Sequence, residues 1–173
     1  MKNTLILAFA TLCISLPLAA EDVEFPSEGP LITLSIPDDW KHEEVDGILQ
    51  AIAGDDMETM FSLKPLQATK KEGSAAIAEI KEPLDKMYDG EITYDKMEES
   101  GVPDGNMNLY TINAEAKLHS ADQGEVTSFV NSIMISFPDT DELLLAQFIS
   151  TKAGFRANAE GIKEIVGSLK KAE

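Results

Sequence analysis

The sequence predicts an α+β fold in which an antiparallel β-sheet has helices packed on both faces, an α/β/α sandwich. Three apolar-rich segments separated by short polar breaks follow one another from Met107 to Ser150, which is typical of a β-meander. Residues 76–87 and Phe155–Leu169 carry apolar side chains at intervals of three and four, as amphipathic helices do. Strands that are apolar on both sides need cover on both faces, so we expect a helical layer on each.

Residues 1–20 have the pattern of a secretory signal peptide. Lys2 precedes an apolar run from Leu5 to Leu16, and the small residues Ala19 and Ala20 follow it. The run is shorter than the roughly 20 residues that a membrane-spanning helix needs, although an uncleaved N-terminal anchor is the alternative. The sequence therefore predicts a periplasmic or secreted protein.

The mature chain is expected to fold without covalent help. Cys13, the only cysteine, lies in the signal segment, and Thr11-Leu12 before it are not the small residues of a lipoprotein signal. The 153 residues left when 20 of 173 are removed can bury an ordinary core. We expect a single α+β domain over residues 31–171, with no integral membrane span. Residues 21–30 are polar, contain two prolines and are expected to form a flexible N-terminal arm.

The charge balance narrows the possible partners. The chain has 14 Lys and Arg against 31 Asp and Glu, a formal net charge of −17. Phosphate binding needs clustered basic residues, and the only adjacent pairs are Lys70-Lys71 and Lys170-Lys171, so nucleic acid is excluded as a partner. The acidic residues are scattered, with no block of five or more, which favours a solvated surface. The alternative is a cationic partner.

The N-terminal half is predicted to supply one strand, a hairpin and a helix. Leu31–Ile36 lies between two prolines and is rich in β-branched residues, and Trp40 after the next turn is expected to be buried. Residues 47–53 and 57–63 are expected to pair through a turn at Gly54. A helix should begin at Ser74, where Pro83 either kinks it or begins a new turn.

The C-terminal half is predicted to contain the meander and the last helix. A strand near a sheet edge is expected over residues 91–98, followed by a loop over residues 99–106. Residues 107–118 alternate between apolar and polar, so one side is buried. Residues 125–137 and 142–150 are apolar on both sides, which indicates central strands.

This order of elements resembles the Mog1/PsbP-like fold, and more narrowly the bacterial exported branch that includes DcrB-type proteins. The resemblance covers most of Leu31–Leu169 and rests on the element order, on Pro37 followed by Trp40, and on the closing helix with Ile165–Leu169. It implies an antiparallel sheet between helical layers, and members that act as binding or assembly factors with no shared catalytic set. The lipobox of many bacterial relatives is missing here.

Residues that carry enzyme chemistry are few. His42 and His119 are the only histidines, and neither belongs to a known ligand motif. His42 followed by Glu43-Glu44 could bind a divalent metal weakly, whereas Pro103-Asp104-Gly105 lacks the alternating ligands of a calcium loop. There is no Gly-x-Ser-x-Gly elbow and no phosphate-binding glycine loop. The sequence therefore predicts no catalytic, cofactor-binding or metal-ligating residue and no cofactor.

These observations favour a noncatalytic exported binding or assembly module. Its partner is expected to be another exported protein that contacts the sheet edge or the acidic surface. The alternative function is a small hydrolase that depends on loop carboxylates or a metal. No pattern in the sequence indicates an oligomeric state.

Overall fold

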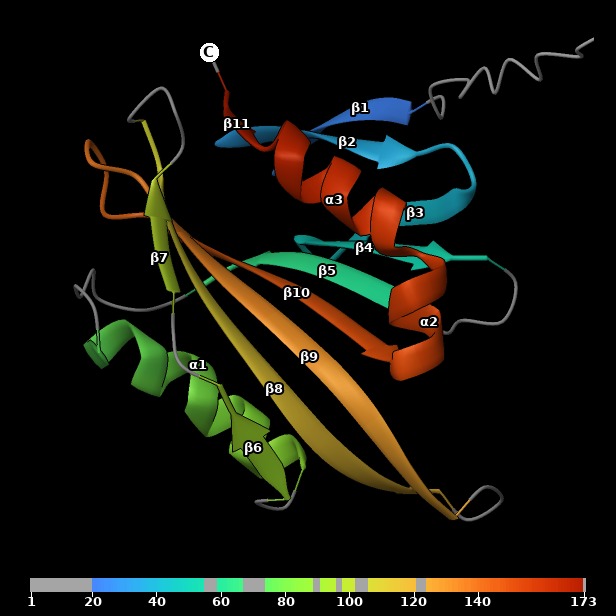
Figure 1. The fold of residues 1–173 in the computed structure, drawn as a ribbon. Helices are drawn as coiled ribbons and strands as arrows, with labels where there is room; N and C mark the ends of the chain where they lie inside the picture. Colours follow the sequence, from blue (N-terminus) through green and yellow to red (C-terminus); the bar gives the residue numbers. More distant parts are fainter. Residues whose placement is uncertain are drawn as a thin grey trace, which may run out of the picture.

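The computed structural model describes residues 20–54, 59–66, 74–88, 91–95, 98–101, 106–120 and 124–172. Within these ranges the chain forms one sheet of eight strands, a second sheet of three strands, and three helices (Figure 1). The predicted signal peptide up to residue 19, the turn residues Asp55 and Asp56, and Pro103-Asp104-Gly105 lie outside the described residues.

The large sheet is antiparallel and has the strand order β3-β4-β5-β10-β9-β8-β6, with β7 also paired to β8. Its strands are β3 (Trp40–Val45), β4 (Ile48–Ala53), β5 (Thr59–Pro65), β6 (Ile92–Tyr94), β7 (Glu98–Gly101), β8 (Asn108–Ser120), β9 (Gly124–Ser136) and β10 (Leu143–Thr151). The predicted meander is therefore confirmed as β8, β9 and β10, and the predicted hairpin of residues 47–63 is confirmed as β4 and β5.

Burial along the meander follows the apolar pattern. Even-numbered residues of β8 such as Ile112 and Ala114 are buried, and Asn113 between them is exposed. Every side chain from Leu143 to Phe148 in β10 is buried, because this strand has a packed layer on each face. One-sided alternation thus identifies the outer strand, and continuous apolar sequence identifies the central one.

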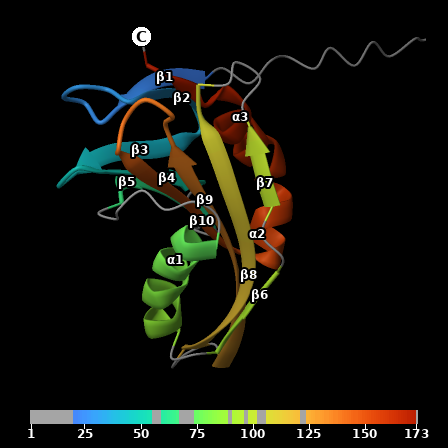
Figure 2. The same ribbon diagram turned by 90° about the vertical axis from the view of Figure 1, so that its left-hand side faces the viewer.

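Two hydrophobic cores lie on opposite faces of the large sheet. On one face, α1 (Ser74–Met87) places Ile80 and Leu84, and Tyr88 directly after it, against β8, β9 and β10. Figure 2 shows α1 on one side of these strands, with α2 (Lys152–Ala157) and α3 (Ala159–Ser168) on the other. The helix predicted from Ser74 is confirmed, and it runs through Pro83 without ending there.

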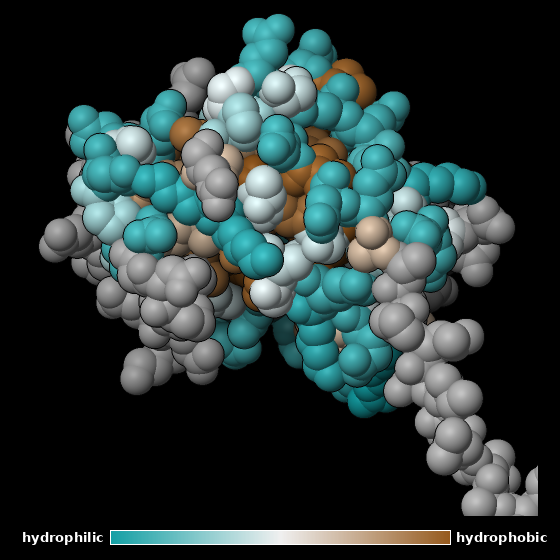
Figure 3. All heavy atoms as spheres, turned by 90° about the horizontal axis from the view of Figure 1, so that it is seen from above, coloured by the Kyte–Doolittle hydropathy of each residue, from teal (hydrophilic) through white to brown (hydrophobic). Residues whose placement is uncertain are grey.

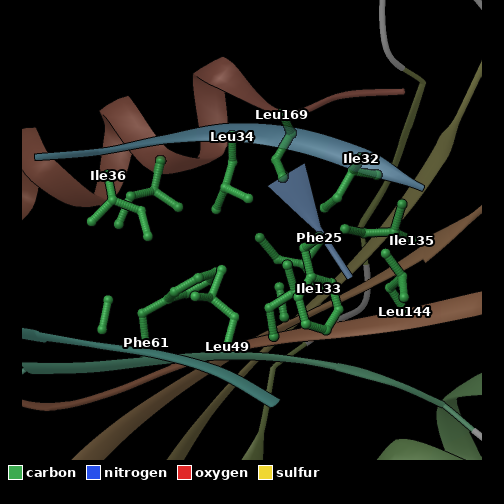
Figure 4. Packing of buried hydrophobic residues seen from close by; sticks show 14 of the residues in the cluster. Phe25, Ile32, Leu34, Ile36, Leu49, Phe61, Ile133, Ile135, Leu144 and Leu169 are labelled. Atoms are coloured by element: carbon green, nitrogen blue, oxygen red, sulfur yellow. The ribbon is translucent and has the colours of Figure 1, made fainter. Parts of the chain in front are cut away.

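The second face is covered by a layer that the sequence did not predict. The small sheet has the order β1-β2-β11, formed by β1 (Ala20–Phe25), β2 (Ile32–Pro37) and β11 (Lys170–Lys171). Figure 4 shows the apolar side chains of β2 facing Leu49 and Phe61 of the large sheet. Ile162 and Ile165 of α3, and Leu169 directly after it, belong to the same core. The expected helical layer is therefore a mixed layer of strands and one helix.

Strand β1 corrects the prediction that residues 21–30 form a flexible arm. It pairs along its length with β2, from Ala20 opposite Pro37 to Phe25 opposite Ile32. Phe25 is 0% exposed, and burial of such a side chain contributes about 1.5–3 kcal/mol. The acidic residues of β1, Glu21, Asp22 and Glu24, are exposed, so a strand that pairs along its length has the composition of a polar leader.

Strand β3 was also missed. Trp40 is buried as predicted, but the polar residues after it extend to Val45 and pair with β4. The connection is the two-residue turn Asp46-Gly47, where both φ angles are positive, at 54° and 72°. Such turns match the twist of a hairpin, and glycine or aspartate tolerates them best.

Two further segments differ from the predictions at their boundaries. The single strand expected over residues 91–98 is two short strands, β6 and β7, and β7 extends into the segment predicted as a loop. The closing helix predicted over Phe155–Leu169 is divided at Asn158, where φ is −104° and ψ is 14°. The Asn158 side-chain nitrogen donates to the carbonyl of Gly154 at 2.9 Å and to Thr59 Oγ1 at 3.0 Å, which fixes the bend between α2 and α3.

Two glycines of α3 differ in how closely they approach the rest of the protein. A Cβ at Gly161 would lie 3.0 Å from Trp40 Nε1 and 3.3 Å from Pro37 Cγ, whereas a Cβ at Gly167 would meet nothing within 4 Å. Overpacking at Gly161→Ala costs about 1–3 kcal/mol, against about 0.5–1 kcal/mol contributed by removing a helical glycine. We expect urea unfolding to show Gly161→Ala destabilised by about 1 kcal/mol.

Gly167→Ala is the matched control and should be neutral or more stable by about 0.5 kcal/mol. A Gly161→Ala protein as stable as Gly167→Ala would contradict the close contact between α3 and Trp40.

Candidate binding groove

A groove lies between the strands β8 and β9 and the helices α2 and α3. It consists of two adjoining hollows of about 250 Å³ and 360 Å³, and both are lined by Asn131 and Phe155. The first hollow also contacts Asp95, Asn113 and Phe129. The remaining side chains of the second hollow come mainly from α3 and β9, and they are Thr111, Ile133, Ile162, Lys163, Val166 and Gly167.

The register of β8 and β9 places the strand side of the groove. Thr111 lies opposite Ile133, Asn113 opposite Asn131 and Glu115 opposite Phe129. These odd-numbered residues of β8 face away from α1, because the even-numbered ones are buried under it. The Asn131 side-chain nitrogen donates to Asn113 Oδ1 at 2.6 Å, so an amide pair forms the floor between the two hollows.

The helix side of the groove is fixed by a buried polar cluster. Thr59 Oγ1 and Ser150 Oγ are 2.7 Å apart, and Asn158 donates to Thr59 from the junction of α2 and α3. Thr151 caps α2 by accepting from the amide of Gly154 at 3.0 Å. These bonds hold α2 against β5 and β10, and as a result Phe155 lies over β9.

Charged side chains lie at both ends of the groove. Lys163 Nζ is 2.8 Å from Glu160 Oε1, so its charge is paired within α3. At the other end, the amide of Asp95 donates to the carbonyl of Asn113 at 2.8 Å, which holds the Asp95 backbone on β8. The Asp95 side chain is exposed, as is that of Glu115.

Tyr94 anchors the strand that carries Asp95. Its hydroxyl donates to Asp85 Oδ1 of α1 at 2.8 Å, and Lys81 Nζ lies 4.4 Å from the centre of its ring. The pKa of Tyr94 is raised well above its ordinary value of 10.0. Burial is the largest cause, and the hydrogen bond to the Asp85 carboxylate and the charge of that carboxylate add to it. The pKa of Tyr88 is also raised, by burial alone.

A third hollow, of about 520 Å³, lies on the outer face of the small sheet. Three of its polar side chains have structural partners: Ser35 Oγ donates to Asp22 Oδ1 at 2.7 Å, and Ser168 Oγ accepts from the amide of Ser35 and donates to the carbonyl of Ile165. Seen from above in Figure 3, this side of the molecule shows hydrophobic atoms between hydrophilic ones. The hydroxyl groups of Ser35 and Ser168 hold β2 to β1 and α3, so these two serines are not placed as nucleophiles.

The side chains of His42, Glu43 and Glu44, which the sequence suggested as weak metal ligands, do not point toward a common position. His42 Nε2 lies 3.8 Å from Glu21 Oε2, and Glu44 accepts from the amide of Ser27 at 3.1 Å. Glu43 points to the opposite side of β3, because successive residues of a strand alternate. Across the described ranges, no three His, Cys, Asp or Glu side chains are grouped to hold a metal ion. The side chain of His119 is outside the described residues.

The groove itself has no local sequence motif. Asp95, Asn131 and Phe155 are brought together by the pairing of β6, β8 and β9 and by the bend at Asn158. Among the helices that the described residues form, none is long and apolar enough to cross a membrane.

No family model and no curated protein matches the chain. Solved structures do match. The solution structure of CyanoP, the cyanobacterial PsbP of Synechocystis sp. PCC 6803, has a TM-score of 0.60 at 8% identity and covers 95% of this chain and 99% of that one. The Saccharomyces cerevisiae Ran-binding protein Mog1p has a TM-score of 0.57 at 13% identity, over 88% of this chain and 95% of that one.

A Pseudomonas aeruginosa protein of unknown function has a TM-score of 0.55 at 12% identity and covers 89% of this chain and 98% of that one. At these identities the likeness concerns the fold alone. The chain is an antiparallel β protein with few short helices, and its fold is Mog1/PsbP-like, as the element order predicted.

The raised pKa of Tyr94 predicts a loss of stability in alkali. The unfolded chain releases the phenol proton near 10.0, whereas the folded chain keeps it, so the free energy of unfolding falls as the pH rises above about 10. Tyr94→Phe removes this contribution, and its stability should fall less steeply between about pH 9 and pH 11 in urea unfolding. Tyr88→Phe is the comparison, because burial alone raises that pKa. If the stability of Tyr94→Phe fell as steeply with pH as that of wild type, the raised pKa of Tyr94 would be contradicted.

Proposed function

We propose that this protein is a noncatalytic exported binding module of the DcrB-like branch of the Mog1/PsbP-like fold. Its groove holds a segment of another exported protein. The observation that carries the proposal is the groove between β8–β9 and α2–α3, an open channel with apolar walls and an amide pair on its floor.

The amide pair favours a peptide as the occupant. The bond from the Asn131 nitrogen to Asn113 Oδ1 does not use Asn131 Oδ1 or the Asn113 side-chain nitrogen, so the amide pair can still accept and donate hydrogen bonds. A peptide group offers one N–H and one C=O, which is the complement of this pair. The aromatic rings of Phe129 and Phe155 on either side supply apolar area for an anchoring side chain.

The lining residues favour binding over catalysis. Among the described residues, Asp95 and Lys163 are the charged residues that line the two hollows, and the charge of Lys163 is paired with Glu160. Of the lining residues that the structure describes, Thr111 alone carries a hydroxyl, and no described histidine or carboxylate lines the same hollow to act as a base. No observation on the described residues favours the hydrolase alternative.

One comparison is compatible with a protein partner, and the predicted cleavage site is compatible with export of this chain. One structure of this fold is that of a Ran-binding protein, so the fold is compatible with binding another protein. Cleavage of the signal peptide is predicted after Ala20, before the residues Glu21–Phe25 that pair with β2. Removal of residues 1–20 would leave Glu21–Phe25 available to pair with β2.

Filling the groove should abolish partner capture. Gly167 lines the second hollow, is exposed and has no atom within 4 Å of a Cβ position, so Gly167→Trp places an indole in the groove without disturbing the core. We expect the tagged wild-type protein to retain a specific protein from a periplasmic extract, and Gly167→Trp to lose at least about nine tenths of it.

Gly167→Ala is the matched control and should retain the partner at the wild-type level. Equal melting temperatures for the two variants would show that folding is unchanged. Capture that survives in Gly167→Trp would place the partner elsewhere on the surface and would overturn the role of the groove.

Export is tested by the mass of the product. When the full chain is expressed in a bacterial host, we expect the periplasmic or secreted protein to begin at Glu21, because cleavage follows Ala20. Phe9→Arg places a charge in the apolar run and should keep the uncleaved chain inside the cell. An uncleaved wild-type chain in the membrane fraction would instead establish the anchor alternative.

A further inference from the structure

The groove has opposite characters at its two ends. We propose that its occupant is an extended segment with an apolar anchor and a neighbouring Lys or Arg, and that the basic side chain lies at the end formed by Asp95 and Glu115. This inference rests on the proposed function, because it specifies the chemistry of the same occupant.

Asp95 and Glu115, here called the carboxylate end, lie beside Phe129. Asp95 lines the first hollow together with Phe129, and Glu115 is directly opposite Phe129 in the register of β8 and β9. Directly opposed residues on one face of an antiparallel pair have their Cβ atoms about 4.5–5.5 Å apart, so Glu115 is next to this ring. Both carboxylates are exposed, and neither has an ion pair or a side-chain hydrogen bond within the described part of the chain.

Ile162, Val166 and Gly167, here called the apolar end, face Ile133 in the second hollow. Lys163, the cation among the described residues that line this end, is already paired with Glu160 at 2.8 Å. An apolar side chain can therefore occupy the second hollow without leaving a charge uncompensated. The glycine at 167 leaves the space above this wall open.

Charge complementarity selects the occupant. A segment with Asp or Glu at the carboxylate end would meet two unpaired carboxylates, as well as the field of a chain with a net charge of −17. A Lys or Arg there gains two partners, and Phe129 beside them can contact the side-chain stem. The peptide backbone between the two ends passes over the Asn113 and Asn131 amides.

The test uses three capped synthetic peptides with the same Leu-Phe-Leu anchor. One carries two flanking Lys, one two flanking Gln and one two flanking Glu, and each is labelled for fluorescence anisotropy against the mature protein. We expect the Lys peptide to bind about tenfold more tightly than the Gln peptide at low salt, since exposed charge pairs contribute modestly. The preference should shrink in high salt, and the Glu peptide should bind most weakly.

Asp95→Asn combined with Glu115→Gln should reduce the preference for Lys over Gln to less than about twofold. Glu28→Gln combined with Glu43→Gln is the control, because both residues are exposed, lie outside the groove and change the net charge equally. Loss of the preference in both double variants would assign it to the overall charge and overturn the inference.

The outcomes separate this inference from the proposed function. If the three peptides bind equally and Gly167→Trp blocks them all, the groove binds peptides and the charge inference fails. If none of the three peptides binds, the inference that the occupant has an apolar anchor and a basic neighbour fails. The comparison of partner capture by wild type and by Gly167→Trp still decides whether the groove binds the partner.

Discussion

The continuous burial of β10 is the constraint on which the rest of the molecule depends. Its residues from Leu143 to Phe148 are buried on both sides, and the strand lies between β5 and β9 in the middle of the large sheet. Phe148 packs against Phe61 with ring centres 4.8 Å apart in the core under the small sheet, whereas Leu143 and Leu145 belong to the core under α1. A sheet with such a strand is stable only when both faces are covered.

The small sheet covers only part of its face of the large sheet, and the groove lies where β8 and β9 extend beyond it. Each of the strands β8 and β9 has 13 residues, compared with six in β2, so the small sheet cannot cover the full length of the outer pair. Figure 1 shows β8 and β9 running diagonally beyond it, with α2 beside them. Side chains at this overhang are Asn, Thr and Phe, a composition suited to contact with both water and an apolar ligand.

Sequence patterns predicted the helices and strands whose apolar residues recur periodically. They missed the polar strands that form because they pair with a neighbouring strand. The meander and α1 followed directly from their apolar spacing. Strand β1 was hidden because its outward-facing residues are acidic, and β3 because it is polar on both sides after Trp40, although Asp46-Gly47 is a strong hairpin signal. The break at Asn158 depends on a hydrogen bond to Thr59, which is 99 residues away. The groove combines such distant contacts, so no local pattern could have shown it.

Strand β2 joins the first and the last elements of the described chain, since it pairs with β1 on one edge and with β11 on the other. The backbone amide of Ser35 donates a hydrogen bond to Ser168 Oγ, which is 133 residues away in the sequence. Pairings of such long range form late, because the chain between them must first be brought together. A polypeptide that emerges with its N-terminus first therefore cannot complete the small sheet until nearly the whole chain has emerged. For a chain threaded through a membrane pore, this delay would preserve the unfolded state that threading requires.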